Sequence, residues 1–484
     1  MSRTLRRALT ELLGEDRTLF DADALRAYEC DGFTIHKAPP EAVVLPRDTQ
    51  EVQAVLRVLA EHEVAFVPRG AGTCLSGGPT PQGPAVVIET AGMNRILAVH
   101  AEDLCAVVQP GVVNAALSRH VEPLGLHYAP DPSSQTVCTI GGNLAENSGG
   151  PHCFKYGMTT DHMLGAVVVL AEGRVVRLGG TAAPCAPGAL DLLALFTGSE
   201  GTFGIATEIT VRLCRNPECV RTLLVALPSM QAACRVVSDI IRAGAIPAAL
   251  EILDRPTILA VEASVFRAGY PTDADAVLLV EMDGPADEVD ADAELVRSIA
   301  ARHAPLSLEE ATTAAERKRL WKGRKGAFGA MGRLRPDLYV LDGVVPRTKL
   351  EETLRGIAEI GARHRVAISN VFHAGDGNLH PNISYDGRDR EETARVVAAG
   401  HEILALCMAM GGSITGEHGI GSEKLAHVPM MFDPADLEVM ARVRRAFDPS
   451  GRCNPGKVLP ERGSCAEPAR WPRLAERVLR EDLA

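Results

Sequence analysis

The chain has 484 residues and a net charge of −12 at pH 7, with 46% apolar and 23% charged residues. This length is too great for one hydrophobic core, so we expect about two or three domains. The acidic balance excludes a nucleic-acid binder with a basic face, and no apolar run reaches the roughly 18 residues of a transmembrane helix. The twelve cysteines include no C-x-x-C pair, so neither a zinc ribbon nor an iron–sulfur cluster is expected. We see no signal peptide and expect a cytoplasmic protein, with membrane attachment through partner subunits as the alternative.

The predicted elements begin with a peripheral helical segment in which Leu5, Leu9, Leu12 and Leu13 have helical spacing. A strand–helix–strand pattern over 42–68 then predicts the start of an α/β region. Beyond Val220, alternating strands and helices predict a cap or substrate domain with a ferredoxin-like rhythm. The predicted fold class is therefore α+β. The expected divisions are an N-terminal helical segment (1–37), a first domain (38–217) and a cap domain (218–420). They are followed by a C-terminal segment that returns to the first domain (421–460) and a polar tail (461–484).

Three glycine-rich clusters lie in the first domain, over 68–78, 139–150 and 198–205. The first follows a strand but lacks both the G-x-G-x-x-G spacing of a Rossmann loop and the G-K-[ST] of a P-loop. Glycine allows backbone N–H groups to turn inward and approach an anion closely. The clusters therefore predict loops that converge on one long phosphate-bearing ligand, or, alternatively, tight turns in a β-rich domain.

His373 and His380 flank an Asp-Gly dipeptide between two strand-like runs. Such a dipeptide predicts a hairpin with a two-residue turn, in which the two imidazoles are directly opposite on one face. Glu417 is then the candidate carboxylate of a two-histidine, one-carboxylate metal site. His418 points another way if the backbone is extended there, so it is the candidate base. A polar turn without a metal is the alternative.

Two later patterns carry predictions of their own. Arg324 or Lys325 can bind a substrate carboxylate, Arg in bidentate fashion, and a solvated surface charge, the more common role of a basic residue, is the alternative for each. Asp433-Pro434 predicts a helix start, with Asp as the N-cap and Pro at the first helical position.

Together these motifs resemble a known family. The sequences PRGAGTxLSGG, PDPSSxxxxTIGGNLAENSGG, KYGMTxDH, GSEGTFGI, HAGDGNLHP, GGSITGEHGIG and FDPSGRCNPGK extend over nearly the whole chain. They are similar to those of the FAD-linked 2-hydroxyacid dehydrogenases with a PCMH-type flavin domain. The branch that contains the FAD-linked D subunits of bacterial glycolate oxidases is the most similar, and D-lactate and D-2-hydroxyglutarate dehydrogenases are relatives. The resemblance implies a two-subdomain flavin domain, an α+β cap and a C-terminal helical segment that returns to the flavin domain.

The resemblance also implies which residues form the site. Thr73 and Cys74 stand where some branches carry the histidine that attaches the flavin, so FAD is expected to be non-covalent. The residues that match FAD-binding positions are Arg69, Gly70, Ala71, Gly72, Thr73, Ser76, Gly77, Pro130, Asp131, Thr139, Gly141, Gly142, Asn143, Gly149, Gly201, Gly204, Ile205 and Asn454. The matching positions outside the flavin loops are His373, His380 and Glu417 for a divalent metal (Zn²⁺, or Mn²⁺), His418 for the base, Arg324 for the carboxylate clamp and Asn382 for the substrate.

The implied reaction is the oxidation of a small D-2-hydroxy acid, glycolate first and D-lactate next, with hydride transfer to flavin N5. Val340 and Phe328 stand where the D-2-hydroxyglutarate branch has a lysine and a threonine, which favours a substrate without a second carboxylate, although Asn382 matches that branch. The electrons are expected to leave through partners, as in systems with a second flavin-type subunit and an iron–sulfur subunit. Two alternatives of other classes are a metal-dependent hydrolase and a flavin-binding subunit without catalysis of its own.

Overall fold

The computed structural model describes residues 1–180 and 190–460, which form two compact units. The first unit contains 1–149, 157–216 and 417–460, and the second contains 150–156 and 217–416. The predicted polar tail over 461–484 lies outside the described residues. Among the described residues, no helix has the length and the apolar composition that crossing a bilayer requires.

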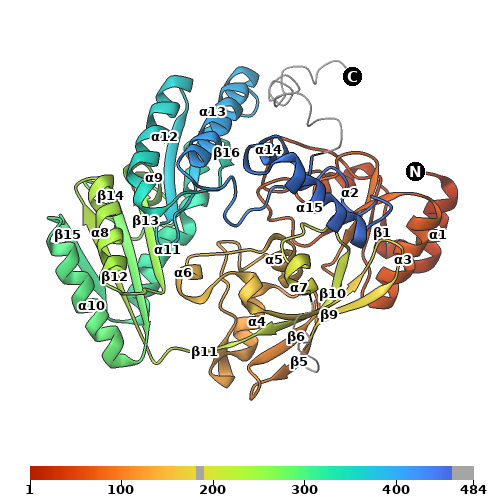
Figure 1. The fold of residues 1–484 in the computed structure, drawn as a ribbon, viewed down its shortest axis with the longest axis horizontal. Coiled ribbons are helices and arrows are strands. Elements are labelled where there is room, and N and C mark those ends of the chain that lie inside the picture. Colours follow the sequence, from red (N-terminus) through yellow and green to blue (C-terminus); the bar gives the residue numbers. More distant parts are fainter. Residues whose placement is uncertain (181–189, 461–484) are drawn as a thin grey trace. The chain divides into compact units, whose positions relative to one another are not determined.

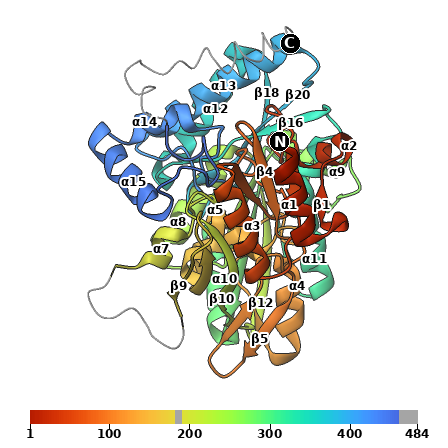
Figure 2. The same cartoon turned by 90° about the vertical axis from the view of Figure 1, so that its right-hand side faces the viewer.

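The first unit begins with a small mixed sheet that is covered by helices. Its elements are α1 (Arg3–Leu13), β1 (Thr18–Leu19), α2 (Ala22–Leu25), β2 (Ala42–Val44), α3 (Thr49–Glu61), β3 (Ala65–Arg69) and β4 (Ala85–Glu89). The strand order is β1-β2-β4-β3, and β4 runs parallel to both β2 and β3. Helices α1 and α3 lie side by side in both ribbon views (Figures 1 and 2). Leu5, Leu9 and Leu13 of the predicted apolar stripe are buried in the core of this sheet, and Leu12 is partly buried against it.

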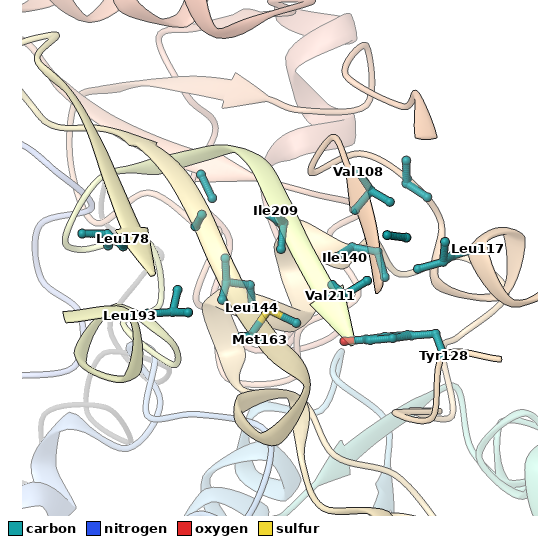
Figure 3. Close-up of a cluster of buried hydrophobic side chains, with 14 of the residues drawn as sticks. Val108, Leu117, Tyr128, Ile140, Leu144, Met163, Leu178, Leu193, Ile209 and Val211 are labelled. Carbon is teal, nitrogen blue, oxygen red and sulfur yellow. The ribbon is translucent and has the colours of Figure 1, made fainter. Parts of the chain in front are cut away.

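A five-stranded antiparallel sheet forms the rest of this unit's frame. Its elements are β5 (Ile96–His100), β6 (Cys105–Val108), α4 (Asn114–Val121), α5 (Ile140–Glu146), β8 (Met163–Val169), β9 (Val175–Gly179), α7 (Leu192–Phe196) and β10 (Ile205–Arg212), beside the short pair β7 (Leu126–His127) and β11 (Cys214–Arg215). The strand order is β5-β6-β10-β8-β9. In Figure 3, Ile140 and Leu144 of α5 lie among core residues that include Ile209 and Val211 of β10. The second glycine cluster is therefore held on a sheet core by the short helix α5.

The C-terminal segment returns to the first unit, as predicted. Helices α14 (Val428–Met431) and α15 (Pro434–Phe447) precede this return. Asp433 caps α15 by accepting the N–H groups of Ala435 and Asp436, which confirms the predicted start. The fully buried Cys453 then forms a parallel bridge with Phe66 of β3.

The second unit is built on a ferredoxin-like sheet. Its elements are β12 (Cys219–Leu227), α8 (Met230–Arg242), β13 (Ala249–Asp254), α9 (Arg255–Glu262), β14 (Ala276–Gly284), α10 (Ala286–Ala301) and β15 (Ser307–Ala311). The strand order β15-β12-β14-β13 is the antiparallel arrangement of a β-α-β-β-α-β motif. The sequence indicated β12, β14 and the two long helices but not β13 or β15. Two acids interrupt the apolar pattern of β13, and most of β15 is polar, so neither reads as a buried strand.

The remaining elements extend this sheet and carry the hairpin. They are α6 (Cys153–Tyr156), α11 (Ala314–Met331), β16 (Asp337–Val340), β17 (Gly343–Val344), α12 (Leu350–His364), β18 (Ala367–His373), β19 (Asn378–Leu379), β20 (Pro381–Tyr385) and α13 (Arg390–Ala409). Strand β18 pairs antiparallel with β13, so the hairpin continues the ferredoxin-like sheet. Helices α12 and α13 lie side by side (Figures 1 and 2).

Residues 150–156 belong to the second unit although the chain on either side of them belongs to the first. Strand β14 holds this segment through acidic side chains. Asp283 forms an ion pair with Lys155 and accepts the hydroxyl of Tyr156 at 2.6 Å, and Glu281 lies 3.1 Å from Nε2 of His152. The second unit therefore consists of two separate stretches of chain.

Candidate active site

The histidine hairpin has a longer turn than the sequence predicted. His373 pairs with Asn378, and Asn370 pairs with Pro381 in the same register. The turn therefore contains the four residues 374–377 rather than two, and the prediction that His373 lies directly opposite His380 is wrong. The side chain of Asp376 accepts the N–H of Asn378 at 3.1 Å, an Asx turn that the Asp-Gly pattern did not reveal.

The two imidazoles nevertheless meet. The observed register differs from the predicted one by two residues, so every side chain keeps its face, and His380 becomes the diagonal neighbour of His373. The ring centroids lie 5.1 Å apart with the planes nearly perpendicular, at 89°. Both side chains are buried. Nδ1 of His380 lies 3.3 Å from the carbonyl oxygen of Leu341.

A third residue of this site, Glu251, escaped the sequence analysis. It stands on β13 directly opposite His373, and its Oε1 lies 2.7 Å from Nδ1 of that histidine. Its other oxygen, Oε2, accepts the Nε–H of Arg324 at 2.6 Å. Glu251 has no exposed surface, and the rest of its strand is also buried. An acid inside a fully buried strand is unusual unless it is paired, but the two acids of β13 keep this segment from reading as a buried strand in the sequence.

Arg324 lies on α11, one helical turn beyond Trp321, and only 1% of it is exposed. Its Nη1 and Nη2 atoms are buried and have no hydrogen-bond partner among the described residues. The same holds for Oδ1 of Asn378 and Oδ1 of Asn382. Buried N–H groups without acceptors are costly, and the two prongs of a guanidinium match a carboxylate. Lys325, the other candidate, is exposed and lies over the Trp321 ring.

A second buried acid, Glu281 on β14, holds the same helix. Its Oε2 accepts the indole N–H of Trp321 at 2.5 Å and the hydroxyl of Thr222 at 2.6 Å. Burial alone would raise the pKa of Glu281, but the hydrogen bond and charge of His152, with those two donors, lower it. Glu281 pairs with Ala249, two residues from Glu251, so both acids are on the face of the sheet that α11 contacts.

Gly416 ends the second unit beside the hairpin. Its N–H donates to the Asp342 carboxylate at 2.9 Å, and a Cβ at this position would lie 2.6 Å from the side chain of Asn378. The backbone therefore passes the hairpin at a distance that only glycine allows. Glu417 and His418, the predicted ligand and base, are the next two residues and begin the last segment of the first unit.

Two glycine clusters hold the backbone around His418. The Ser76 hydroxyl donates to the main-chain oxygen of His418 at 2.8 Å. The Glu200 carboxylate accepts the N–H groups of Ile420 and Gly421, each at 2.6 Å. Within the first unit, the loop after His418 is thus fixed by main-chain contacts that do not depend on the imidazole.

The three glycine clusters and the C-terminal return meet in the first unit. A Cβ at Gly70 would lie 2.6 Å from Oγ1 of Thr139, so the first two clusters are in contact. The side-chain amide of Asn454 donates to the carbonyl oxygens of Gly78 and Glu200, which joins the first and third clusters to the return. The second cluster is not a loop as expected: Thr139 caps α5 by accepting the N–H of Gly142, and Gly141 and Asn143 lie within this helix.

In the first glycine cluster, the backbone at Gly72 packs against the guanidinium of Arg69. Nη2 of Arg69 donates to the carbonyl oxygen of Cys30, while Nη1 is buried without a hydrogen-bond partner among the described residues. Gly72 has φ +68°, and a Cβ there would lie 2.2 Å from the guanidinium. Ala71 and Thr73 flank this glycine. A buried cation with an unused N–H inside a glycine turn suits an anionic group.

Most of the remaining predicted flavin residues lie in loops and turns of the first unit. The side chain of Asn114 donates to the carbonyl oxygen of Pro130, one residue before Asp131, and to Oδ1 of Asn143. Four others occupy turns and a strand start: Gly77 and Gly201 with φ +78° and +68°, Gly204 with φ +133°, and Ile205, which begins β10. Gly149 is the last residue of the first unit before the 150–156 segment.

Buried acids and a buried lysine surround these loops. Burial, followed by the charge of Glu200, raises the pKa of Glu146 well above its usual value, and burial also raises the pKa of Glu200. Burial raises the pKa of Asp31 to about 6 and lowers that of Lys457 to about 8. These shifts favour the neutral forms, and Glu146, whose pKa is raised well above its usual value, can then donate a proton in a hydrogen bond as well as accept one.

Comparisons with known proteins agree with this arrangement. The C-terminal domain of FAD linked oxidases matches residues 216–458, and an FAD binding domain matches 40–179. Glycolate oxidase subunit GlcD of Escherichia coli is 46% identical over 91% of this chain and 88% of its own length. D-lactate dehydrogenase of Anaerostipes hadrus is 33% identical over 87% and 90%. A solved p-cresol methylhydroxylase, 18% identical, has the same fold with a TM-score of 0.80 over 94% of this chain and 96% of its own.

Proposed function

We propose a specific reaction for this chain, which belongs to the FAD-linked oxidase family and is an FAD-linked 2-hydroxyacid oxidoreductase. The reaction is the oxidation of a small D-2-hydroxy acid to the 2-oxo acid, with glycolate as the first candidate and D-lactate as the next. The observation that carries this proposal is the pair of unpartnered Arg324 nitrogens in the unit that holds His373 and His380. The family excludes the metal-dependent hydrolase, whereas a flavin subunit without catalysis requires an experiment.

The first unit fits FAD. The buried Nη1 of Arg69 and the turns at Gly70 and Gly72 would hold the pyrophosphate. The residues of the second and third clusters and Asn454 would line the rest of the cofactor. No histidine stands at Thr73 or Cys74 for covalent attachment, which supports non-covalent FAD.

The second unit offers the donor set of a divalent metal. Two buried histidines, each with Nδ1 directed at an oxygen acceptor, present Nε2 as the ligand atom. Glu417 follows Gly416 by one peptide bond, and Gly416 is packed against Asn378 of the same hairpin. We therefore assign the third ligand to Glu417 and the metal to Zn²⁺, with Mn²⁺ as the alternative, because nitrogen and carboxylate ligands suit both.

Arg324 would bind the substrate carboxylate, with Nη1 and Nη2 donating to its two oxygens. Asn382 offers a buried Oδ1 for the substrate hydroxyl, and Val340 is its direct cross-strand partner. The ring of Phe328 lies 6.5 Å from that of His380. These apolar neighbours favour glycolate or lactate over an acid with a second carboxylate.

His418 would take the hydroxyl proton, since a histidine needs little pKa tuning to act as a base near neutrality. When bound, FAD supplies the hydride acceptor and the metal supplies a Lewis acid for the hydroxyl. The backbone contacts of Ser76 and Glu200 position the His418 loop before substrate arrives.

The decisive experiment is anaerobic flavin bleaching by the purified chain with glycolate, D-lactate, L-lactate and D-2-hydroxyglutarate. We expect glycolate and D-lactate to bleach the flavin, L-lactate to fail, and D-2-hydroxyglutarate to react at least about tenfold more slowly, which corresponds to about 1.4 kcal/mol. Fast bleaching by D-2-hydroxyglutarate would contradict the proposed preference for a substrate without a second carboxylate. A flavin that none of these acids reduces would identify a non-catalytic subunit.

Removing the metal tests its part separately. Treatment with a chelator should leave FAD bound, because the flavin loops and the two histidines belong to different units. Bleaching by glycolate should stop and return when Zn²⁺ or Mn²⁺ is added, since the hydroxyl loses its Lewis acid. Flavin reduction at an unchanged rate after the metal has been shown to be absent would remove the metal from the reaction.

Gly70→Ala tests the flavin loops. The new Cβ would lie 2.6 Å from Oγ1 of Thr139 and must displace the cap of α5. We expect about tenfold weaker FAD binding, or about 1.4 kcal/mol, measured as flavin retained after dialysis. Gly83→Ala is the matched control, because nothing lies within 4 Å of a Cβ there. Equal flavin retention by the two variants would show that the contact of the clusters does not support FAD.

The electrons are proposed to pass to a partner. The GlcD relative is named a subunit of glycolate oxidase, which supports partner subunits in general. We propose a second flavin-type subunit and an iron–sulfur subunit for this role. Membrane association, if it occurs, would come through them.

A further inference from the structure

We propose that Glu251 is a positioning residue that orients the metal ligand His373 and the carboxylate clamp Arg324 at the same time, an inference that rests on the function proposed above. Its two oxygens are divided between these two residues, Oε1 to Nδ1 of His373 at 2.7 Å and Oε2 to Nε of Arg324 at 2.6 Å.

The cost of burying this acid shows that it has a specific use. Glu251 has no exposed surface and Arg324 only 1%. Burying an ion pair costs several kcal/mol per ion, and a well-packed apolar pair of similar volume is often as stable. Stability alone therefore does not call for Glu251. Its contacts with two proposed substrate-site residues supply the other reason.

Each contact selects one orientation. A carboxylate at Nδ1 fixes the His373 tautomer that carries its proton on Nδ1, which directs Nε2 toward the metal. Arg324 uses only Nε for Glu251, so its Nη1 and Nη2 prongs are left for the substrate. In a 2-hydroxy acid the carboxylate and the hydroxyl are on adjacent carbons, so the metal and the clamp must be correctly spaced. One rigid acid on β13 sets both.

Glu281 provides an internal comparison. It is also buried, lies on the same face of the sheet and holds α11, but through Trp321, Thr222 and His152. It bonds to neither His373 nor Arg324 among the described contacts. A role confined to fixing the helix belongs equally to both acids, whereas orienting the metal ligand belongs to Glu251 alone.

The test compares Glu251→Gln with Glu281→Gln in the full chain loaded with FAD. A glutamine has one acceptor oxygen and adds an NH₂ group, so it cannot accept from both partners. We expect Glu251→Gln to weaken Zn²⁺ binding about 10- to 100-fold, measured by competition with a chromophoric chelator without turnover. The KM for glycolate should rise as well. Glu281→Gln should change the Zn²⁺ affinity and the KM by less than about twofold. Both variants should lower the thermal stability by similar amounts, because each removes a buried hydrogen-bond acceptor.

Each outcome decides the matter. Zn²⁺ affinity and KM close to wild type in Glu251→Gln would overturn the inference, as would equal losses in Glu281→Gln. If Glu251→Gln does not fold, Glu251→Asp keeps the charge one methylene shorter and should shift both quantities in the same direction by less. Wild-type protein that binds no Zn²⁺ would refute the metal site itself, and this inference with it. If the wild-type protein binds Zn²⁺ and reduces its flavin, and Glu251→Gln keeps the wild-type Zn²⁺ affinity and KM, only this inference is refuted and the proposed function stands.

Discussion

His418→Asn is expected to leave FAD bound and to slow flavin reduction by glycolate about 10³-fold, within the range typical of a lost general base. The side-chain change should spare the loop, because Ser76 holds the main-chain oxygen of His418 and Glu200 holds the N–H groups that follow. Stopped-flow reduction at saturating glycolate gives the rate, and the visible flavin spectrum gives the cofactor content.

His427→Asn is the control, since it changes a buried histidine of the same segment that no proposed step uses. It should reduce its flavin within about twofold of the wild-type rate, a change of about 0.4 kcal/mol in the barrier. Fast reduction by His418→Asn would assign the base to another residue. Flavin lost from that variant would mean that the imidazole supports the cofactor loops.

Arg324→Lys is expected to raise the KM for glycolate about 100-fold, or about 2.7 kcal/mol, with a smaller effect on kcat. Lysine keeps the charge but offers a single point of donation. It cannot serve Oε2 of Glu251 and both oxygens of a carboxylate together. Steady-state kinetics with an artificial electron acceptor measure both constants.

Lys325→Met removes the neighbouring charge and supplies the control, because Lys325 is exposed beside the Trp321 ring. It should leave the KM within about twofold of wild type, as expected for an exposed charge. A KM that rises in Lys325→Met and not in Arg324→Lys would show that Lys325, rather than Arg324, binds the substrate carboxylate. A fall in kcat alone in Arg324→Lys would mean that the guanidinium acts on the transition state rather than in binding.

Local rules predicted the parts of this structure that local chemistry determines. The start of α15 follows from an Asp cap and a proline at the first position, and the stripe of α1 follows from leucines at helical spacing. Motif resemblance added the flavin fold, and the site residues that it implies stay predictions. In the cap domain, β13 and β15 could not be predicted from the sequence, because β13 contains buried acids and most of β15 is polar.

The hairpin shows where a sequence pattern falls short. Asp-Gly correctly predicted a turn, but Asp376 uses its side chain for the N–H of Asn378, and the turn gains two residues. The histidines still share a face because the change in register is even. Glu251 could not be assigned to them, since the strand pairing that places it opposite His373 joins segments more than a hundred residues apart.

The 150–156 segment has a consequence for dividing this protein into pieces. A fragment made of 217–416 alone would lack His152, Lys155 and Tyr156, so Glu281 would lose one of its partners and Asp283 two. A graft of the second unit onto another protein therefore has to carry both stretches of chain. Recombination at a single pair of breakpoints would transfer β14 without the side chains that pair with its two acids.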